Sequence, residues 1–244
     1  MEEVKDKKEM NKTQVFNVII LDRSGSMGHI RQAAIDGFNE TLAGIKKAQE
    51  KYVETQDHFV SLVTFCGCET KHVFDNTPVA EANPLKREDY RPCCTTPLYD
   101  AMGITLTATS EHVKEMDDYV VVVTIITDGM ENASCEYNGK TVKELVECLR
   151  GEGWTFTYMG ANQDSVEVAM NLSIRNSRNF AHGNRGTLNA MRKDASTRLN
   201  FFSRLASMKL DGSSGVELMS TEKRRKLYAS MADDAFDEED GKQQ

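Results

Sequence analysis

Several features that mark other classes of protein are scarce in this chain of 244 residues. It contains only 4 prolines and 16 glycines, and no long linker or internal repeat divides it. No segment approaches the roughly eighteen consecutive apolar residues that a membrane-spanning helix requires. Hydrophobic residues nevertheless make up 39% of the chain, and a chain of this length can bury a sizeable core. The composition therefore favours a single soluble α/β domain.

Positive charge is also in short supply. Lys and Arg number 30 against 38 Asp and Glu, which gives a formal net charge of −8 and a pI near 5.3. This balance argues against a nucleic-acid backbone as the main partner, because the two would repel each other. Residues 1–12 are charged throughout and no apolar stretch follows that would make a signal peptide. We therefore expect a cytoplasmic protein with neither a nucleic-acid nor a membrane partner.

The six cysteines include no Cys-x-x-Cys pair, so the sequence signals neither a zinc ribbon nor a thioredoxin-like redox site. They occur as Cys66-Gly-Cys68, adjacent Cys93 and Cys94, and single Cys135 and Cys148. We interpret Cys66, at the end of an apolar run, and Cys148, on an expected helix, as small core residues. Cys93 and Cys94 come just before the loop at Thr96, so an influence of oxidation on that loop stays open.

An apolar run over residues 15–21 ends in Asp22, and hydroxyls follow at Ser24 and Ser26. Such a run predicts a central strand of a sheet that is covered on both faces. The three polar side chains then lie at the carboxyl end of the strand, where open α/β sheets bind their ligands. With Gly25 in a tight turn between them, they can point at one spot. One carboxylate and two hydroxyls suit a hard cation such as Mg²⁺ or Mn²⁺ and suit zinc poorly.

Two further segments supply what such a site would lack. Residues 119–127 form a second β-branched run, which ends in Asp128 and Gly129. Between the two runs, residues 95–101 are typical of a loop that enters a helix. Because Pro is favoured at the first helical position, Thr96 is expected at the N-cap of that helix.

The order Asp22-x-Ser24-x-Ser26, Thr96-Pro-Leu and Thr127-Asp128-Gly129 resembles the metal-ion-dependent adhesion site (MIDAS) of von Willebrand factor A-type (vWA) domains. The likeness extends over roughly residues 15–180. It implies a site for Mg²⁺ or Mn²⁺ made by Asp22, Ser24, Ser26, Thr96 and Asp128. It also implies that the three hydroxyls bind the ion directly and that the two carboxylates act largely through water. Each motif alone also fits a plainer interpretation, as an ordinary turn or a helix cap.

The resemblance implies a protein-binding module and not an enzyme, with no catalytic residues. Neutral hydroxyl ligands leave the charge of a divalent ion incompletely neutralised, and one coordination position is open to solvent. An Asp or Glu side chain of a partner protein would complete the coordination. Residues 160–164 and the C-terminal helix also resemble stand-alone prokaryotic and phage-type members of the family. Such members often work beside AAA+ ATPases or in stress- or phage-related complexes.

Two other classes of function stay open. Asp22 could be the nucleophile of a metal-dependent phosphohydrolase, but Ser24 stands where those enzymes need a second Asp as general acid. Neither Ser24 nor Ser26 has the Gly two residues earlier that a serine-hydrolase elbow requires, and no Gly-x-x-x-x-Gly-Lys phosphate loop occurs. The other alternative is an assembly protein with a vestigial metal site.

Four residues near the motif invite more specific expectations. Arg23 and Met27 occupy its variable positions and are expected to face the ligand. His29 either tunes ligand access or is simply a surface histidine at a helix start. Asp100 either suits the dipole in the first turn of its helix or supports the metal loop through a hydrogen bond.

The remaining patterns predict a doubly wound, mostly parallel, Rossmann-like α/β sheet with a C-terminal helical extension. Helices are expected at 29–52, 98–116, 141–151, 164–172 and 187–208, the third opening with a capping box from Thr141 to Glu144. Further strands are expected at 59–65, 154–159 and 174–180, with 70–74 pairing with the first as a hairpin.

Four parts are expected along the chain. They are a charged extension (1–13), a vWA-like domain (14–182), a helix packed on or beside it (183–210) and a polar, acidic tail (211–244). The tail is expected to be partly disordered, with a short helix near residues 223–226 and a solvated final dozen residues.

Overall fold

A computed structural model describes residues 11–161, 164–180, 183–211 and 215–241. Six strands form one sheet in the order β3-β2-β1-β4-β5-β6. Their bounds are β1 (Thr13–Asp22), β2 (Gln56–Cys66), β3 (Glu69–Pro78), β4 (Tyr119–Thr127), β5 (Thr155–Gly160) and β6 (Asn176–Asn179). Neighbouring strands are parallel except for β2 and β3, which form an antiparallel hairpin. The predicted doubly wound, mostly parallel sheet is thus confirmed, as are its central strand and its hairpin.

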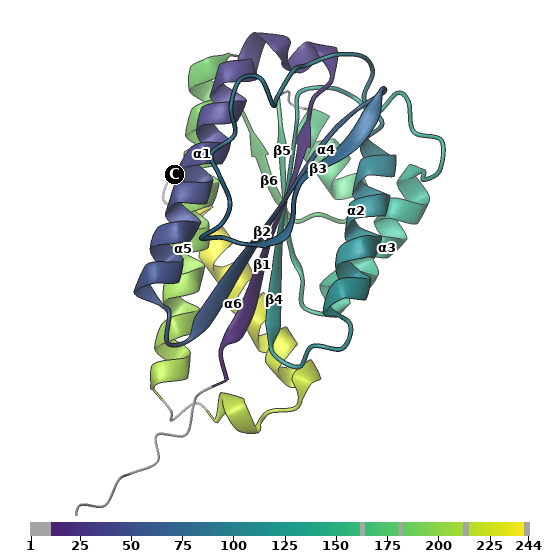
Figure 1. Cartoon of the computed structure of the whole chain (residues 1–244). Helices are drawn as coiled ribbons and strands as arrows, with labels where there is room; N and C mark the ends of the chain where they lie inside the picture. The colour runs from purple at the N-terminus through teal and green to yellow at the C-terminus, as the bar shows by residue number, and fades with distance from the viewer. Residues whose placement is uncertain (1–10, 162–163, 181–182, 212–214, 242–244) are drawn as a thin grey trace, which may run out of the picture.

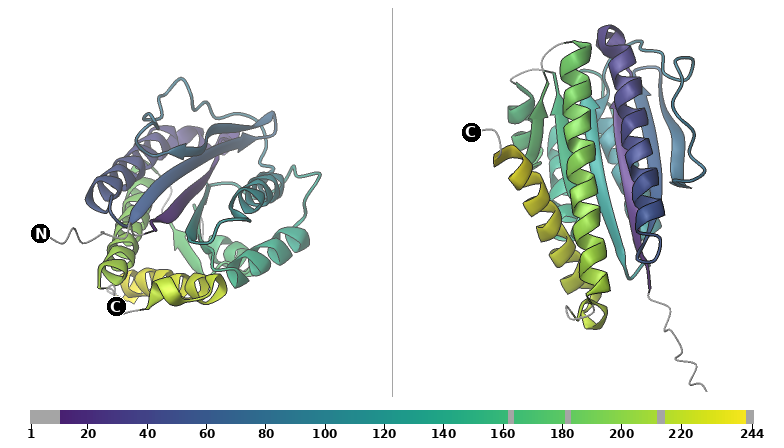
Figure 2. Two further views of the ribbon diagram at one scale, coloured as in Figure 1. Left: turned by 60° about the horizontal axis from the view of Figure 1, so that its bottom comes forward. Right: turned by 90° about the vertical axis from the view of Figure 1, so that its left-hand side faces the viewer.

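Helices cover both faces of this sheet (Figures 1 and 2). One face carries α1 (Arg31–Lys51), α5 (Asn184–Leu210) and α6 (Thr221–Gly241), and the other carries α2 (Leu98–Val113), α3 (Gly139–Gly151) and α4 (Asp164–Asn171). Two short 3₁₀ helices, η1 (Gly25–Ile30) and η2 (Val216–Leu218), complete the fold. Side chains alternate along β1 because successive residues of a strand point to opposite faces. Val15 and Ile19 pack beneath α1 and α5, whereas Phe16 and Val18 pack beneath α2 and α3.

The strand order places the predicted site at a switch point of the sheet. The chain winds from β1 toward β2 on one side and from β4 toward β5 on the other, so adjacent parallel strands β1 and β4 separate the two halves. Both end at the upper edge of the sheet in Figure 1. Open α/β sheets bind ligands at this position because the loops leave the two strands in opposite directions.

A buried polar network attaches α5 to the middle of the sheet. Arg198 on α5 is 1% exposed and forms an ion pair of 2.9 Å with Asp194 one helical turn earlier. Its guanidinium also donates to Asn17 Oδ1 on β1 at 3.1 Å and to the hydroxyl of Thr124 on β4. The predicted C-terminal helix is therefore present, and it packs on the sheet and beside α1.

Two local predictions are wrong. The predicted capping box began at Thr141, but α3 starts at Gly139 and its N-cap is Asn138. The Asn138 side chain accepts the backbone N–H groups of Lys140 and Thr141, and Thr141 closes the box from position N3. An Asn cap followed by Gly at the first helical position carries a weaker sequence signal than Thr-x-x-Glu.

The second wrong prediction is the acidic tail. The helix α6 continues to Gly241 and does not end after a short helix near residues 223–226. Its inner face buries Tyr228, Ala232, Ala235 and Phe236 against the domain. These four apolar residues recur at helical spacing, and their burial outweighs the repulsion among the acidic residues between them. Residues 1–10 of the predicted N-terminal extension lie outside the described residues. In the part of the chain that the structure describes, no helix is both long enough and apolar enough to cross a membrane.

Candidate metal-binding site

Asp22 ends β1 with its carboxylate fully buried. One oxygen accepts the backbone N–H of Ser24 at 2.6 Å, and the other accepts the hydroxyl of Thr127 at 2.6 Å. Burial removes water from the charged form and raises the pKa of Asp22 to about 6, and the nearby charge of Asp128 adds to this rise. A bound cation would stabilise the charged Asp22 carboxylate against both its burial and the repulsion from Asp128.

Ser24, Ser26 and Asp128 continue the cluster from two different loops. The hydroxyl oxygens of Ser24 and Ser26 lie 3.0 Å apart, and Ser26 donates to Asp128 Oδ1 at 2.6 Å. Asp128 Oδ2 is buried, and no donor among the described residues makes a hydrogen bond to it. Since buried polar atoms are normally paired, this oxygen is suited to a cation or a water bound to one.

Gly129 shows how closely the oxygens of the three segments approach each other. A Cβ atom built on this glycine would lie 2.9 Å from Thr96 Oγ1, 3.4 Å from Ser26 Oγ and 3.7 Å from Asp22 Oδ2. Only a residue without a side chain fits here, and the space is bordered by oxygens from all three loops. The structure therefore brings Asp22, Ser24, Ser26, Thr96 and Asp128 together at one edge of the sheet. A carboxylate and hydroxyl set of this kind fits a hard divalent cation.

Thr96 reaches this cluster in a different way from the one predicted. The helix α2 begins at Leu98 with Pro97 at its N-cap, and no side chain caps it. Thr96 is thus one residue outside the cap position, and its N–H donates instead to Asn132 Oδ1 at 2.9 Å. The Thr96 hydroxyl, which would have been used by a cap, is left facing the cluster.

Two carboxylates that the sequence did not single out as a pair hold the loop after β4 against α2. Glu131 accepts the N–H groups of Tyr99, Ala133 and Ser134 at 2.8–2.9 Å. Asp100 accepts the N–H groups of Cys135, Glu136 and Tyr137 at 2.7–2.9 Å. Asp100 therefore lies in the first helical turn, as expected, and also supports the loop that follows Asp128. The contacts that join the loop to α2 span more than 30 residues of sequence, so no local pattern predicts them.

The expectations for Arg23 and Met27 are wrong. Met27 is fully buried in the core that η1 shares with α1 and α5. Arg23 points away from the oxygen cluster, where its guanidinium meets Glu69 Oε1 at 2.8 Å and Cys66 Sγ at 3.3 Å. The turn after Asp22 rotates alternate side chains inward, so the serines face the site and the variable positions do not.

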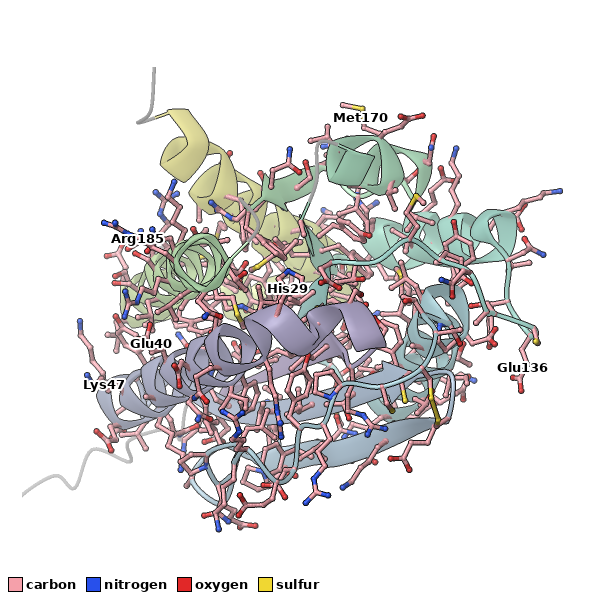
Figure 3. All side chains as sticks on the ribbon, turned by 90° about the horizontal axis from the view of Figure 1, so that it is seen from above. His29, Glu40, Lys47, Glu136, Met170 and Arg185 are labelled. Atoms are coloured by element: carbon pink, nitrogen blue, oxygen red, sulfur yellow. A yellow bond between two sulfur atoms is a disulfide. The ribbon has the colours of Figure 1, made fainter. Side chains whose placement is uncertain are left out.

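His29 lies beside the oxygen cluster at the carboxyl edge of the sheet (Figure 3). Its Nδ1 is 2.5 Å from the carbonyl oxygen of Ser26 and 3.6 Å from Asp128 Oδ2, and its side chain is 48% exposed. Asp128 also lines a pocket of about 350 Å³, together with Leu98, Tyr99, Tyr158, Ala161 and Val168 among others. Met130 borders it and is 74% exposed.

The cysteines are only partly as expected. Cys66 is buried, but Cys148 is exposed on the outer face of α3. Cys68 and Cys94 form a disulfide, which the sequence did not predict. The carbonyl oxygen of Cys94 accepts the N–H of Gly25 at 3.0 Å, so the loop that carries Cys94 directly contacts the Asp22–Ser26 turn.

Comparison with known proteins gives a fold and no close relative. No family model matches the sequence, and neither does any curated protein. Among solved structures, the pilus adhesin SpaC from Lactobacillus rhamnosus GG is 14% identical with a TM-score of 0.58, covering 80% of this chain and 32% of that one. The SpRpn10 VWA domain is 9% identical with a TM-score of 0.51, covering 75% and 95%.

A third similar structure is proximal thread matrix protein 1 from the mussel byssus, solved with a zinc-occupied MIDAS motif. It is 13% identical with a TM-score of 0.52, and the match covers 77% of this chain and 46% of that one. This chain thus spans less than half of the adhesin and of the byssus protein. At these identities the likeness shows the fold alone, and that fold is the one of vWA domains.

Proposed function

We propose that this protein is a divalent-metal-dependent protein-binding module, in which Asp22, Ser24, Ser26, Thr96 and Asp128 hold Mg²⁺ or Mn²⁺. An Asp or Glu side chain of a partner protein completes the coordination of the ion. The convergence of oxygens from three separate loops around Gly129 carries this proposal. The zinc-occupied MIDAS of the byssus protein supports a divalent ion at this motif, and the all-oxygen donor set favours Mg²⁺ or Mn²⁺ over zinc.

The charge of the donor set explains the preference for an acidic partner. Serine and threonine hydroxyls bring no negative charge, and Asp22 and Asp128 are already engaged by hydrogen bonds from Thr127 and Ser26. A bound divalent ion supplies the positive charge that attracts a further carboxylate. Removal of water from such a contact strengthens the attraction, because charges interact more strongly at low dielectric.

The surface next to the cluster adds an apolar contact for the partner. Met130 is exposed at the edge of the pocket beside Asp128, and the pocket walls are largely apolar and aromatic. Protein interfaces concentrate their binding energy in such methionine and aromatic positions. We infer that the partner segment carries an apolar side chain close to its Asp or Glu.

The proposal assigns no catalytic role to Asp22. Both of its oxygens accept short hydrogen bonds, and Ser24 occupies the position where a phosphohydrolase of this kind needs an acid. The intact donor set likewise favours a working site over an assembly protein with a vestigial one. Membership of the stand-alone prokaryotic or phage type stays a proposal drawn from sequence resemblance, as does an AAA+ ATPase or a stress- or phage-related complex as partner.

Metal titration with a matched pair of variants tests the site. Asp22→Ala removes a cluster carboxylate, whereas Asp36→Ala removes an exposed carboxylate on α1. We expect calorimetry with MgCl₂ and MnCl₂ to detect binding in the wild type and Asp36→Ala and none in Asp22→Ala, with unchanged circular dichroism. Equal binding in all three proteins would refute the site. Hydrolysis of a phosphate ester that is lost in Asp22→Asn would favour the phosphohydrolase instead.

A further inference from the structure

Four cysteines gather on the side of the Asp22–Ser26 turn that faces away from the oxygen cluster. Cys66 ends β2, Cys68 follows in the turn to β3, and Cys93 and Cys94 come from the loop before α2. The sulfur atoms of Cys66, Cys68 and Cys93 lie within 4.8 Å of one another. The Cys66 and Cys93 sulfurs are 3.4 Å apart, and Cys94 is joined to Cys68. The sequence signalled no such group, because its members come from two segments about 25 residues apart.

Backbone hydrogen bonds hold the two segments together independently of any bond between sulfurs. Gly67 N donates to Thr95 O at 2.9 Å and joins them directly. Arg23 links them through its backbone, since Cys93 N donates to Arg23 O at 2.9 Å and Arg23 N donates to Phe65 O at 2.7 Å. A side chain at Gly67 would collide with Thr95, since a Cβ there would lie 2.1 Å from its hydroxyl. Cys94 itself adopts a left-handed conformation with φ of 61°, which is uncommon for a residue other than glycine. The scaffold thus fixes the positions from which the sulfurs project.

The sulfurs lie between a buried wall and an exposed side, with a positive charge next to the buried one. The Arg23 guanidinium lies 3.3 Å from Cys66 Sγ and brings a positive charge to the cluster. Cys66 forms a buried inner wall at 2% exposure, whereas Cys68 and Cys94 lie on the exposed side. An ion could therefore reach the group from solvent and be held on one side by a buried ligand. Figure 3 shows the Cys68–Cys94 disulfide as a yellow bond.

We propose that Cys66, Cys68, Cys93 and Cys94 form a tetrahedral thiolate site for Zn²⁺ when the Cys68–Cys94 disulfide is reduced. Zinc–sulfur bonds of about 2.3 Å in a tetrahedron place the sulfurs roughly 3.8 Å apart, and the sulfurs of Cys66, Cys68 and Cys93 already lie within 4.8 Å of one another. Cys94, bonded to Cys68, is the fourth sulfur next to this group. Soft thiolates select Zn²⁺ where the oxygen cluster selects a hard ion, so the two sites differ in their metal. The Arg23 guanidinium contacts both Cys66 Sγ and Glu69, so its positive charge beside the thiolates is shared with one carboxylate.

Reduction of the Cys68–Cys94 disulfide needs only a phosphine and water as reactants. The phosphine transfers two electrons to the disulfide, takes the oxygen of a water molecule and becomes a phosphine oxide. The two protons of that water complete the Cys68 and Cys94 thiols. Each thiol that then binds the ion releases its proton to solvent.

Cobalt titration of the full chain tests this site with a readout that belongs to sulfur. After phosphine reduction, we expect Co²⁺ to produce the sulfur-to-cobalt charge-transfer band and the intense visible bands of tetrahedral cobalt. Zn²⁺ should displace the cobalt and remove both. The band should be clearly weaker in Cys68→Ser, whose exposed position leaves the fold intact, and should be lost when all four cysteines of the cluster are changed to serine.

Three controls separate this site from its alternatives. Cys135→Ser and Cys148→Ser change exposed cysteines outside the cluster and should keep the band. Ser26→Ala changes the oxygen cluster and should also keep it. The unreduced protein, with two ligands tied up, should show a much weaker band. No band in the reduced wild type would mean that the cysteines form a thiol–disulfide pair only, and a band of undiminished intensity in Cys68→Ser would equally overturn the proposal.

Discussion

At the scale of single residues, burial decides what the two aspartates of the oxygen cluster can do. Asp22 and Asp128 are both withdrawn from water, and the pKa of Asp22 rises because its charged form is desolvated. Two carboxylates in such proximity destabilise each other unless a cation lies between them or hydrogen bonds compensate. Thr127 and Ser26 provide such hydrogen bonds, which explains how the site can stay assembled before an ion binds.

His58 gives the protein a pH dependence that can be measured apart from the metal site. It is buried on β2, its Nε2 lies 2.9 Å from Gln56 Oε1, and its ring packs edge-on against Phe202. Burial disfavours the imidazolium and lowers the pKa of His58 from 6.5 to about 4. In the unfolded chain His58 takes up a proton near pH 6.5, so the folded state loses stability as the pH falls from about 6.5 to about 4.

The expected size of this loss is about 3 kcal/mol, because each pKa unit corresponds to roughly 1.4 kcal/mol. Asp22 acts in the opposite direction over part of this range, since its pKa is raised in the folded state. The effect of His58 is therefore the difference between urea unfolding curves of the wild type and His58→Gln, measured at several pH values. A difference that does not change with pH would show that His58 is accessible to protons in the folded protein.

At the scale of elements, α5 depends on a charge pair within the core. Asp194 and Arg198 are 3% and 1% exposed at their side chains and lie 2.9 Å apart. Asp194→Ala would leave the guanidinium without its counter-charge, and we expect a loss of about 3–5 kcal/mol in the free energy of unfolding. The double variant Asp194→Ala, Arg198→Met removes both charges and should be more stable than the single one. A double variant less stable than the single one would contradict this assignment of the cost.

The elements also show how far the sequence could predict the site. The apolar runs at β1 and β4 are long and uninterrupted, so their ends, and with them Asp22 and Asp128, could be placed from periodicity alone. The position of Thr96 depended on a cap that Pro97 takes instead. Glu131 and Asp100 accept backbone N–H groups of residues more than 30 positions away across the α2–loop contact. Arg23 turns toward the β2–β3 hairpin because its guanidinium contacts Cys66 at the end of β2 and Glu69 at the start of β3. Contacts of this kind are set by tertiary packing and leave no local pattern.

At the scale of the whole molecule, the C-terminal helices close the face of the sheet that α1 leaves open. The carboxylate of Asp118, just before β4, forms an ion pair with Lys209 Nζ of α5 at 2.5 Å. It also accepts a hydrogen bond from the hydroxyl of Tyr228 of α6 at 3.1 Å. Arg225 of α6 lies over the ring of Tyr119 at 4.3 Å. This part of the chain looked like a solvated tail because its charge outweighs its few apolar residues, yet those residues share one helical face.

Phe236 tests whether α6 contributes to the stability of the domain. Its ring is 1% exposed and packs near Arg178 of β6, with 6.0 Å between the guanidinium carbon and the ring centre. We expect Phe236→Ala to lower the free energy of unfolding by about 3 kcal/mol, because it leaves a cavity. Leu218→Ala is the matched control, since Leu218 is 92% exposed and should cost little. Equal stability of the two variants in urea would mean that α6 is not part of the cooperative fold.

The central claim is that a metal ion held by the oxygen cluster binds an acidic side chain, and water-proton relaxation of the Mn²⁺-loaded protein tests it most directly. N-acetyl-aspartate amide should displace water from the ion and lower the relaxation rate, whereas N-acetyl-asparagine amide should not. Thr96→Ala should weaken the aspartate effect about tenfold to a hundredfold, the loss of one charge-assisted contact of about 1.5–3 kcal/mol, while changing Mn²⁺ affinity less. Equal effects of the two amides, or an aspartate effect that Thr96→Ala leaves unchanged, would contradict the account.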